Sequence, residues 1–264
     1  MRFGSDLHET IESGERNLSL RSVENIALGA VMKLVTWNCL GALSKKHQQI
    51  LTLDADIMVI QECSQPFSEQ INRSEGWSSA WFGKNTKKGL GVLVRAPWII
   101  REALALKLQW VGRLVICGPT SIEMFPVWAC KDKSSTAEYI ERVHLMLDII
   151  EQTPLSECTI VVGDFNSNSR WDGEYALKNN HTAAVERFRK LGLESAYHKF
   201  FGETQGRERN PTLWFMKNKT KPYHIDYAFL SRSLLPKLKS VVVGRCDDWL
   251  SLSDHAPVLV EIDL

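Results

Sequence analysis

The sequence predicts an α/β fold, and two kinds of segment support this prediction. Short apolar runs that are rich in β-branched residues and bounded by polar or turn residues are typical of buried strands. Amphipathic segments with the period of a helix lie between some of these runs. The 264 residues are 44% hydrophobic, which is enough for a large core. Because no repeat, low-complexity tract or linker interrupts residues 32–264, we expect them to form a single domain.

Five strand-like runs lead into or out of a polar side chain. They are KLVTWN (33–38), DIMVIQE (56–62), TIVVGDFN (159–166), HIDYAFL (224–230) and SDHAPVLVEI (253–262). A carboxylate, amide or imidazole can leave the core only at the end of a buried strand, because apolar side chains surround the middle. We therefore expect the polar residues of these runs to converge.

Two helices are predicted from capping residues and periodicity. Ser135 followed by Glu138 forms a capping box, after which an apolar stripe of helical spacing ends before Pro154. A second helix is expected to begin near Thr182 and to end at Gly192.

Residues 1–31 differ from the rest of the chain. Residues 1–24 are mostly polar, and NIALGAVM (25–32) is apolar but too short to span a membrane. No basic region precedes it, so we expect neither a secretory signal nor a membrane segment. We interpret residues 1–31 as an N-terminal extension: either Met32 is the natural start, or the extension forms a small helix docked on the domain.

The six cysteines are irregularly spaced and include no CxxC pair. Reduced, buried thiols in a cytoplasmic protein are therefore expected. Cys39 and Cys63 adjoin candidate ligands, but the alternation of side chains along a strand points them away from the site. This argues against a nucleophilic cysteine.

The polar residues of the five runs predict a metal site. The candidates are Asn38, Glu62, Asp164, Asn166, Asp226, Asp254 and His255. Carboxylates that converge repel one another, and burying them unpaired is strongly unfavourable, so a divalent cation resolves the conflict. Oxygen and amide donors, with no Cys/His cluster at metal spacing, favour Mg²⁺, or Mn²⁺, over zinc.

The same residues carry a resemblance to a known family. TWN (36–38), QE (61–62), GDFN (163–166), IDY (225–227) and SDH (253–255) resemble, in order and wording, the motifs of the endonuclease/exonuclease/phosphatase superfamily, the group of pancreatic deoxyribonuclease and the apurinic endonucleases. This resemblance spans roughly residues 32–264. It implies a four-layer α/β/β/α sandwich of two mainly antiparallel sheets flanked by helices. The alternative is an unrelated α/β domain whose polar residues cap its strands.

The resemblance implies a divalent-metal-dependent phosphoesterase, first of all a nuclease or phosphodiesterase in which water attacks in line. By motif match, Asp164 activates the water and Asn166 helps to hold the phosphoryl oxygens. His255 contacts the scissile phosphate or acts as acid or base, and Asp226 fixes its tautomer.

The metal would be bound directly by Glu62, with Asn38 as a neutral ligand or phosphate contact and Asp254 contributing from a neighbouring strand start.

Two departures from the family pattern stand out. Leu40 replaces an acidic residue that many members carry, which favours one metal over two. Trp128 replaces a His or Tyr of the middle strand, so either His255 acts without that group or another residue, such as Tyr139 or Lys131, replaces it.

The sequence gives weaker signals for the substrate than for the fold and the metal site. A net charge of +1 and a pI of about 7.6 give no global field for nucleic acid, so a local patch must supply affinity. The segment 202–224 interleaves basic and aromatic residues, which suits a phosphate backbone with stacked bases; alternatively its aromatic residues pack inward. The candidate substrate-binding residues are Arg170, Trp214, Lys217, Lys219 and Lys221. Lys84, Lys87 and Lys88 form another basic group before the GLGVLV run.

The expected partner is nucleic acid or a phosphorylated small molecule, without a membrane. The Trp-Cys-Asp-Arg-Ile signature of inositol polyphosphate phosphatases is missing where this chain reads YHIDYAFL, which disfavours that branch. The alternatives to a nuclease are a phosphomonoesterase acting on a small phosphorylated molecule and a non-catalytic binding module that retains the fold.

Overall fold

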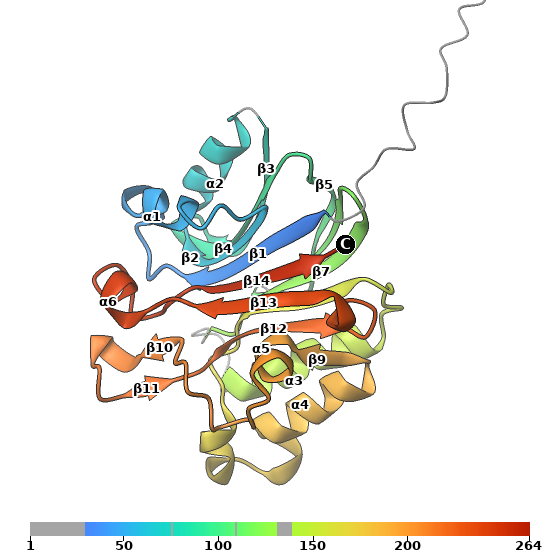
Figure 1. Cartoon of the computed structure of the whole chain (residues 1–264), viewed down its shortest axis with the longest axis vertical. Coiled ribbons are helices and arrows are strands. Elements are labelled where there is room, and N and C mark those ends of the chain that lie inside the picture. Colours follow the sequence, from blue (N-terminus) through green and yellow to red (C-terminus); the bar gives the residue numbers. More distant parts are fainter. Residues whose placement is uncertain (1–29, 75, 109, 131–138) are drawn as a thin grey trace, which may run out of the picture.

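The computed structural model describes residues 30–264 apart from 75, 109 and 131–138. Two six-stranded sheets are stacked in this part of the chain, and helices cover their outer faces (Figure 1). The four-layer α/β/β/α sandwich implied by the sequence motifs is thus confirmed. Residues 1–29 lie outside the described residues, so the N-terminal extension stays a prediction. The first strand begins at Val31, which pairs with Asp263, so the domain begins slightly before residue 32.

The first sheet has the strand order β13-β14-β1-β2-β4-β3. Its strands are β1 (Val31–Asn38), β2 (Ile57–Cys63), β3 (Trp77–Asn85), β4 (Lys88–Arg95), β13 (Leu238–Val243) and β14 (Val258–Asp263). Helices α1 (His47–Leu51) and α2 (Gln65–Asn72) cover its outer face. There Ile50 and Phe67 pack against Val35, Trp37 and Met58.

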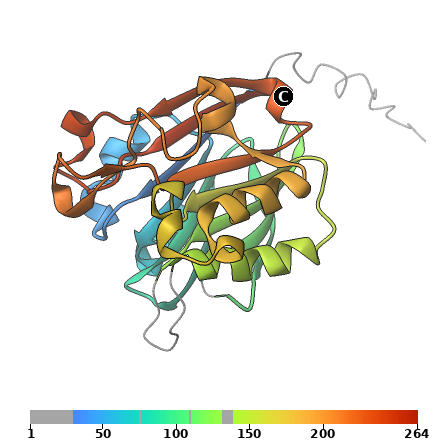
Figure 2. The same ribbon diagram turned by 90° about the horizontal axis from the view of Figure 1, so that it is seen from below.

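The second sheet has the order β5-β6-β7-β8-β12-β9. Its strands are β5 (Ile99–Ala105), β6 (Gly112–Cys117), β7 (Ser121–Trp128), β8 (Thr159–Asp164), β9 (Leu193–Ser195) and β12 (Asp226–Ser231). Helices α3 (Tyr139–Glu151) and α4 (His181–Lys190) lie side by side on its outer face (Figure 2). The remaining elements are α5 (Ala196–Phe201), α6 (Cys246–Trp249) and the short hairpin of β10 (Leu213–Trp214) and β11 (Pro222–Tyr223).

Both expected helices are present. The stripe of α3, namely Ile140, Val143, Leu147 and Ile150, is buried, whereas Ser135 and Glu138 lie outside the described residues. Helix α4 begins at His181 rather than Thr182, because the side chain of Asn180 caps it by accepting a hydrogen bond from the N–H of Ala183. Gly192, with φ +78°, follows its end as expected.

One parallel pair in each sheet positions the site. Strands β1 and β2 are parallel, as are β7 and β8, while the other pairs in both sheets are antiparallel. The carboxyl ends of these four strands carry Asn38, Glu62, Trp128 and Asp164. Strands β12 and β14 run in the opposite direction and begin at the same edge, at the left of Figure 1. The polar residues that follow or precede these strands therefore meet at one end of the sandwich.

All six cysteines are free thiols. Cys39 and Cys63 are buried, and burial raises the pKa of Cys39 to about 12 and that of Cys63 still further. Neither thiol is therefore ionised near neutral pH, as a nucleophile would have to be. No helix in the described ranges is long and apolar enough to cross a bilayer. The cytoplasmic location stays a prediction.

Candidate active site

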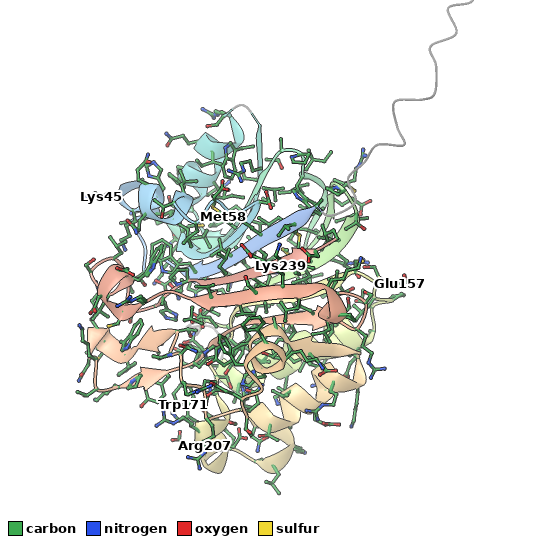
Figure 3. The ribbon with its side chains drawn as sticks, viewed as in Figure 1. Lys45, Met58, Glu157, Trp171, Arg207 and Lys239 are labelled. Carbon is green, nitrogen blue, oxygen red and sulfur yellow. The ribbon has the colours of Figure 1, made fainter. Side chains whose placement is uncertain are left out.

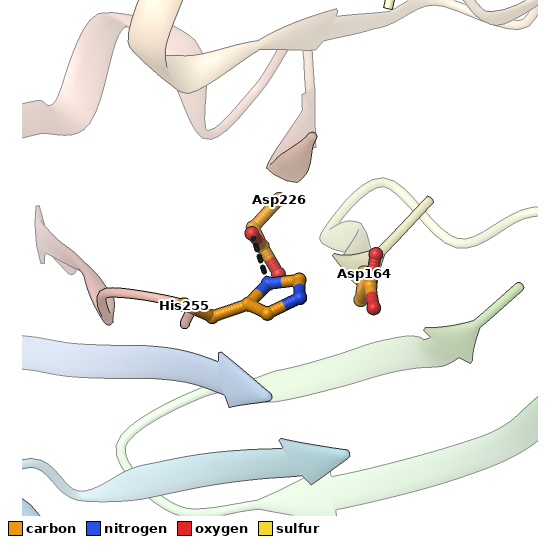
Figure 4. A group of neighbouring side chains, drawn as sticks. All are labelled: Asp164, Asp226 and His255. Carbon is orange, nitrogen blue, oxygen red and sulfur yellow. Dashed lines mark hydrogen bonds and ion pairs between the residues drawn. The ribbon is translucent and has the colours of Figure 1, made fainter. Parts of the chain in front are cut away.

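Asp226 and His255 form a buried pair where the two sheets meet (Figure 4). His255 Nδ1 lies 3.0 Å from Asp226 Oδ2. The backbone N–H of Asp226 donates to Thr212 Oγ1 at 3.1 Å, and that of His255 donates to Ser253 Oγ at 3.1 Å. The main chain is thus held on both sides, which fixes the imidazole against the carboxylate.

Asp164 ends β8 and is fully buried. The preceding Gly163 has φ +150°, and a Cβ atom there would lie 1.9 Å from Val127 O, so the close approach of β8 to β7 requires glycine. Asp164 Oδ1 accepts a hydrogen bond from the N–H of Asn166 at 2.9 Å. Asn166 Nδ2 donates to Asp164 Oδ2 at 2.9 Å and to Ala129 O at 3.2 Å. Both amide hydrogens of Asn166 therefore hold the loop and Asp164 in place.

Asn38 connects the two sheets at the site. Its Nδ2 donates to Asp164 Oδ2 at 2.9 Å and lies 3.4 Å from Glu62 Oε1. Glu62 sits in a β-bulge of β2 with φ +63°, a left-handed conformation that is uncommon outside glycine and that re-aims the side chain. Lys88 Nζ, from the first residue of β4, lies 2.7 Å from Glu62 Oε2.

The charges of these buried groups favour a protonated imidazole. Burial alone lowers the pKa of His255, but the charges of Asp226 and Asp164 and the hydrogen bond to Asp226 raise it to about 10. Burial and the charge of Asp226 raise the pKa of Asp164 to about 7. A carboxyl group that titrates near neutral pH suits a general base.

A divalent cation fits the oxygen atoms that remain. Asp226 Oδ1 and Asp254 Oδ1 are buried and accept no hydrogen bond from any described residue, and such atoms are unfavourable without a positive partner. Glu62 adds a carboxylate and Asn38 an amide oxygen. This set of hard oxygen donors suits Mg²⁺ or Mn²⁺.

Two sub-sites can be considered for the ion. The ligand atoms of Asp164, Asp226 and His255 all lie within 4.8 Å of one another. However, a protonated imidazole offers no nitrogen lone pair to a metal. This argues against His255 as a ligand of the ion and leaves the carboxylate oxygens as the candidate ligands.

Comparison with known proteins identifies the family. The family model described as the Endonuclease/Exonuclease/phosphatase family matches residues 35–255, a range that contains the seven candidate site residues. The chain belongs to this family. Its members are phosphoesterases and nucleases. No curated protein sequence matches the chain.

Solved structures show the same fold at low identity. The 3′ phosphatase NExo from Neisseria, bound to a product DNA hairpin, is 19% identical with a TM-score of 0.67, covering 88% of this chain and 100% of that one. An AP endonuclease from Archaeoglobus fulgidus is 16% identical with a TM-score of 0.67 and the same coverages. An AP endonuclease from Leishmania major is 13% identical with a TM-score of 0.64, covering 89% of this chain and 88% of that one.

The resemblance of the sequence motifs places Trp128 where many members of the endonuclease/exonuclease/phosphatase family are expected to carry a catalytic His or Tyr. It ends β7 and is paired in register with Asp164. Lys88 Nζ lies 5.7 Å from the centroid of the Trp128 ring while it binds Glu62. A positive charge thus reaches this corner of the site from β4 instead of the middle strand.

The two residues expected to replace the missing His or Tyr, Lys131 and Tyr139, can also be located, and so can Leu40, which replaces an acidic residue. Lys131 lies outside the described residues. Tyr139 lies in the wall of a cavity beside Asn166. Leu40 is 43% exposed and has φ +51°, and its N–H donates to Asn38 Oδ1 at 3.0 Å. The place of a second acidic ligand therefore holds an apolar side chain.

The hairpin of β10 and β11 exposes its basic residues and buries its tryptophan. Trp214 is 6% exposed and packs with Trp37 and Trp249, whereas Phe215 is 47% exposed. Trp214 thus packs inward, the alternative left open by the sequence, and its ring offers no face for stacking with a base. The remaining candidates, Arg170, Lys217, Lys219 and Lys221, are all exposed.

Some residues that hold the site were given no role by the sequence. Ser253 Oγ donates to Asn38 O at 2.7 Å, so it links the end of β1 to His255. Gln61 Nε2 donates to Thr36 Oγ1 at 2.9 Å and to Val127 O at 3.3 Å, which ties the two sheets together. Ser253 lies in the SDH motif and Gln61 in the QE motif, so their position beside candidate site residues was the signal for their role.

Proposed function

We propose that the protein is a divalent-metal-dependent phosphodiesterase that hydrolyses nucleic acid or nucleotides by in-line attack of water. The observation that supports this best is the convergence of Glu62, Asn38, Asp164, Asp226 and His255 at the strand ends of both sheets. The fold is shared with structures described as a 3′ phosphatase bound to a DNA hairpin and as AP endonucleases. Those descriptions support nucleic acid as the substrate class.

The roles of the residues follow from their charge and contacts. Asp164, with its pKa raised towards neutrality, takes the proton of the attacking water. Asn166 and Asn38 hold both oxygens of Asp164 by hydrogen bonds and so aim it. The imidazolium of His255, oriented by Asp226, donates from Nε2 to a phosphoryl or leaving oxygen.

Mg²⁺ or Mn²⁺ would be held by Glu62, Asn38 and Asp254 and would supply positive charge to the phosphate and the departing oxygen. Lys88 adds a second positive charge at the Trp128 corner. Because Lys88 is half exposed while Glu62 is largely covered, its ammonium group can turn from the carboxylate to a substrate phosphate at little cost in packing.

The test is hydrolysis by the purified protein with Mg²⁺, Mn²⁺ or EDTA. The substrates are single- and double-stranded DNA, RNA, and a nitrophenyl phosphodiester and phosphomonoester, with Asp164→Asn as the blank. Metal-dependent cleavage of diesters that is absent in the blank is expected. Cleavage of the monoester alone would identify a phosphomonoesterase, and no hydrolysis of any substrate would identify a binding module.

A further inference from the structure

Three cavities lie next to one another on the outer side of the hairpin of β10 and β11. The middle cavity, of about 280 Å³, shares Arg170 and Gly206 with a second cavity of about 340 Å³. It shares Pro211 and Trp214 with a third cavity of about 300 Å³, so the three cavities form one outer groove. We propose that the outer groove binds an extended acidic segment of a partner protein.

The hairpin stands between the outer groove and the catalytic residues. Successive side chains of a strand point to opposite faces. In β10, Leu213 lines the cavity beside Asn166, whereas Trp214 lines the outer groove. One end of the groove lies where α6 meets the hairpin (Figure 1), and Figure 3 shows Arg207, at the other end, below the hairpin. A segment in the outer groove and a substrate at the catalytic residues can therefore be bound together.

The outer groove carries an excess of positive charge. Its exposed cations are Arg170, Arg207, Arg209, Lys219 and Arg245. The acidic residues in its walls are Glu208 and Asp247. Arg207 and Arg245, one near each end, form no ion pair with any residue that the structure describes. Carboxylates of a bound segment can pair with both guanidinium groups, whose planar forks match a carboxylate.

An acceptor without a partner favours a peptide over a phosphate backbone. His224 lines the middle cavity and is 2% exposed. Its Nδ1 lies 2.8 Å from Asn210 O, and burial lowers the pKa of the ring, so the neutral ring carries its proton on Nδ1. Nε2 is buried and accepts no hydrogen bond from any described residue. A backbone N–H of an extended segment can donate to Nε2, whereas a DNA phosphodiester backbone offers only acceptors.

The aromatic rings of the outer groove are already packed against other side chains. Trp214 is 6% exposed. The Tyr223 ring centroid lies 4.8 Å from that of Trp171 and 5.3 Å from the Arg170 guanidinium. Proteins that bind single-stranded nucleic acid stack its bases on aromatic side chains. Since neither ring is free for this stacking, the groove fits an acidic peptide better than a nucleic acid.

The experiment measures the binding of fluorescently labelled hexaglutamate and hexaglutamine to the full chain by anisotropy at low salt. Hexaglutamate should bind more tightly. Loss of one exposed ion pair weakens binding by up to about fivefold, so Arg207→Gln combined with Arg245→Gln should weaken hexaglutamate by about tenfold. The matched control combines Arg73→Gln with Arg101→Gln, two exposed arginines outside the groove, and should leave the affinity unchanged. Both double variants should hydrolyse a nitrophenyl phosphodiester at the rate of the unaltered protein.

Equal affinities for the two peptides would overturn the inference. An equal loss of affinity in the two double variants would also overturn it, because net charge alone would then explain the binding. Nitrogen NMR locates the peptide: the Nε2 resonance of His224 should shift when hexaglutamate binds, and an unchanged resonance would mean that the peptide lies elsewhere. Thymidylate or uridylate hexamers that bind in place of hexaglutamate, and are weakened by the groove substitutions, would identify a nucleic-acid surface instead.

Discussion

Asp226→Asn isolates the electrostatic role of the buried pair. The Asp226 carboxylate is fully buried and lies 3.0 Å from the imidazole nitrogen of His255. The amide of asparagine has nearly the same shape, so the substitution removes a charge without leaving a cavity. The pKa of His255 should then fall towards or below its ordinary 6.5, because burial opposes the imidazolium and its main charged partner is gone.

The magnitude follows from the pKa of His255. Its rise from 6.5 to about 10, at about 1.4 kcal/mol for each pKa unit, corresponds to at most on the order of 5 kcal/mol in favour of the charged ring, part of it due to Asp164. Because the folded-state pKa lies above the unfolded one, this stabilisation is fully present below pH 6.5 and is lost as the pH rises through about 10. The free energies of unfolding of the two proteins should therefore differ most near pH 6 and converge towards pH 10.

Urea unfolding across this pH range in EDTA measures the difference, and NMR titration of the His255 ring measures its pKa directly. Asp247→Asn is the matched control, because this exposed carboxylate forms a surface ion pair with Lys219. A His255 that still titrates near pH 10 in Asp226→Asn would refute the reasoning, as would a stability difference that is independent of pH.

Three further predictions concern catalysis and binding. Asp164→Asn should abolish hydrolysis and lower the melting temperature by only about 5 °C, because the base is lost and the side chain keeps its size, while its amide nitrogen cannot accept the hydrogen bond made to the oxygen that it replaces; a fall of tens of degrees would contradict this separation. Lys88→Gln should lower kcat by about tenfold or more while Lys88→Arg retains most of it, since one charge-assisted hydrogen bond to the phosphate is lost; equal kcat values in kinetic assays would remove Lys88 from the mechanism. Replacing Lys217, Lys219 and Lys221 together by Gln should weaken polynucleotide binding and reduce the slope of its salt dependence by up to about three; filter binding at several salt concentrations tests this, and an unchanged slope would mean that these residues do not contact the backbone.

The strands and the polar residues at their ends could be predicted because both signals are local. A β-branched run followed by Asn38 or Asp164 is visible within eight residues, and the glycine of GDFN marks the place where only hydrogen fits against Val127 O. The four layers of the sandwich could be predicted only from the resemblance of the motifs to a known family. The pairing of β1 with β14 joins residues that are far apart in the chain. Periodicity alone does not determine such pairings.

Other parts of the site depend on contacts that no local pattern records. Lys88 meets Glu62 only through the register of β2 with β4 and the bulge between them. Trp214 and Phe215 are adjacent and equally apolar, and the tertiary fold alone decides which of them is buried. Thr212 has no motif around it, yet its hydroxyl accepts the N–H groups of both Ile225 and Asp226.

The position of β14 between β13 and β1 in the first sheet has a consequence for the order of folding. During synthesis, β1 emerges before the other strands of this sheet and β2 can pair with one of its edges, but the other edge stays open until β14 has been made. The imidazole of His255 reaches Asp226 only when that last strand pairs, so any activity that needs the pair would switch on late. Closing such a distant contact is slow compared with local structure formation. We expect the exposed edge of β1 to make the incomplete chain a substrate for chaperones and prone to aggregation.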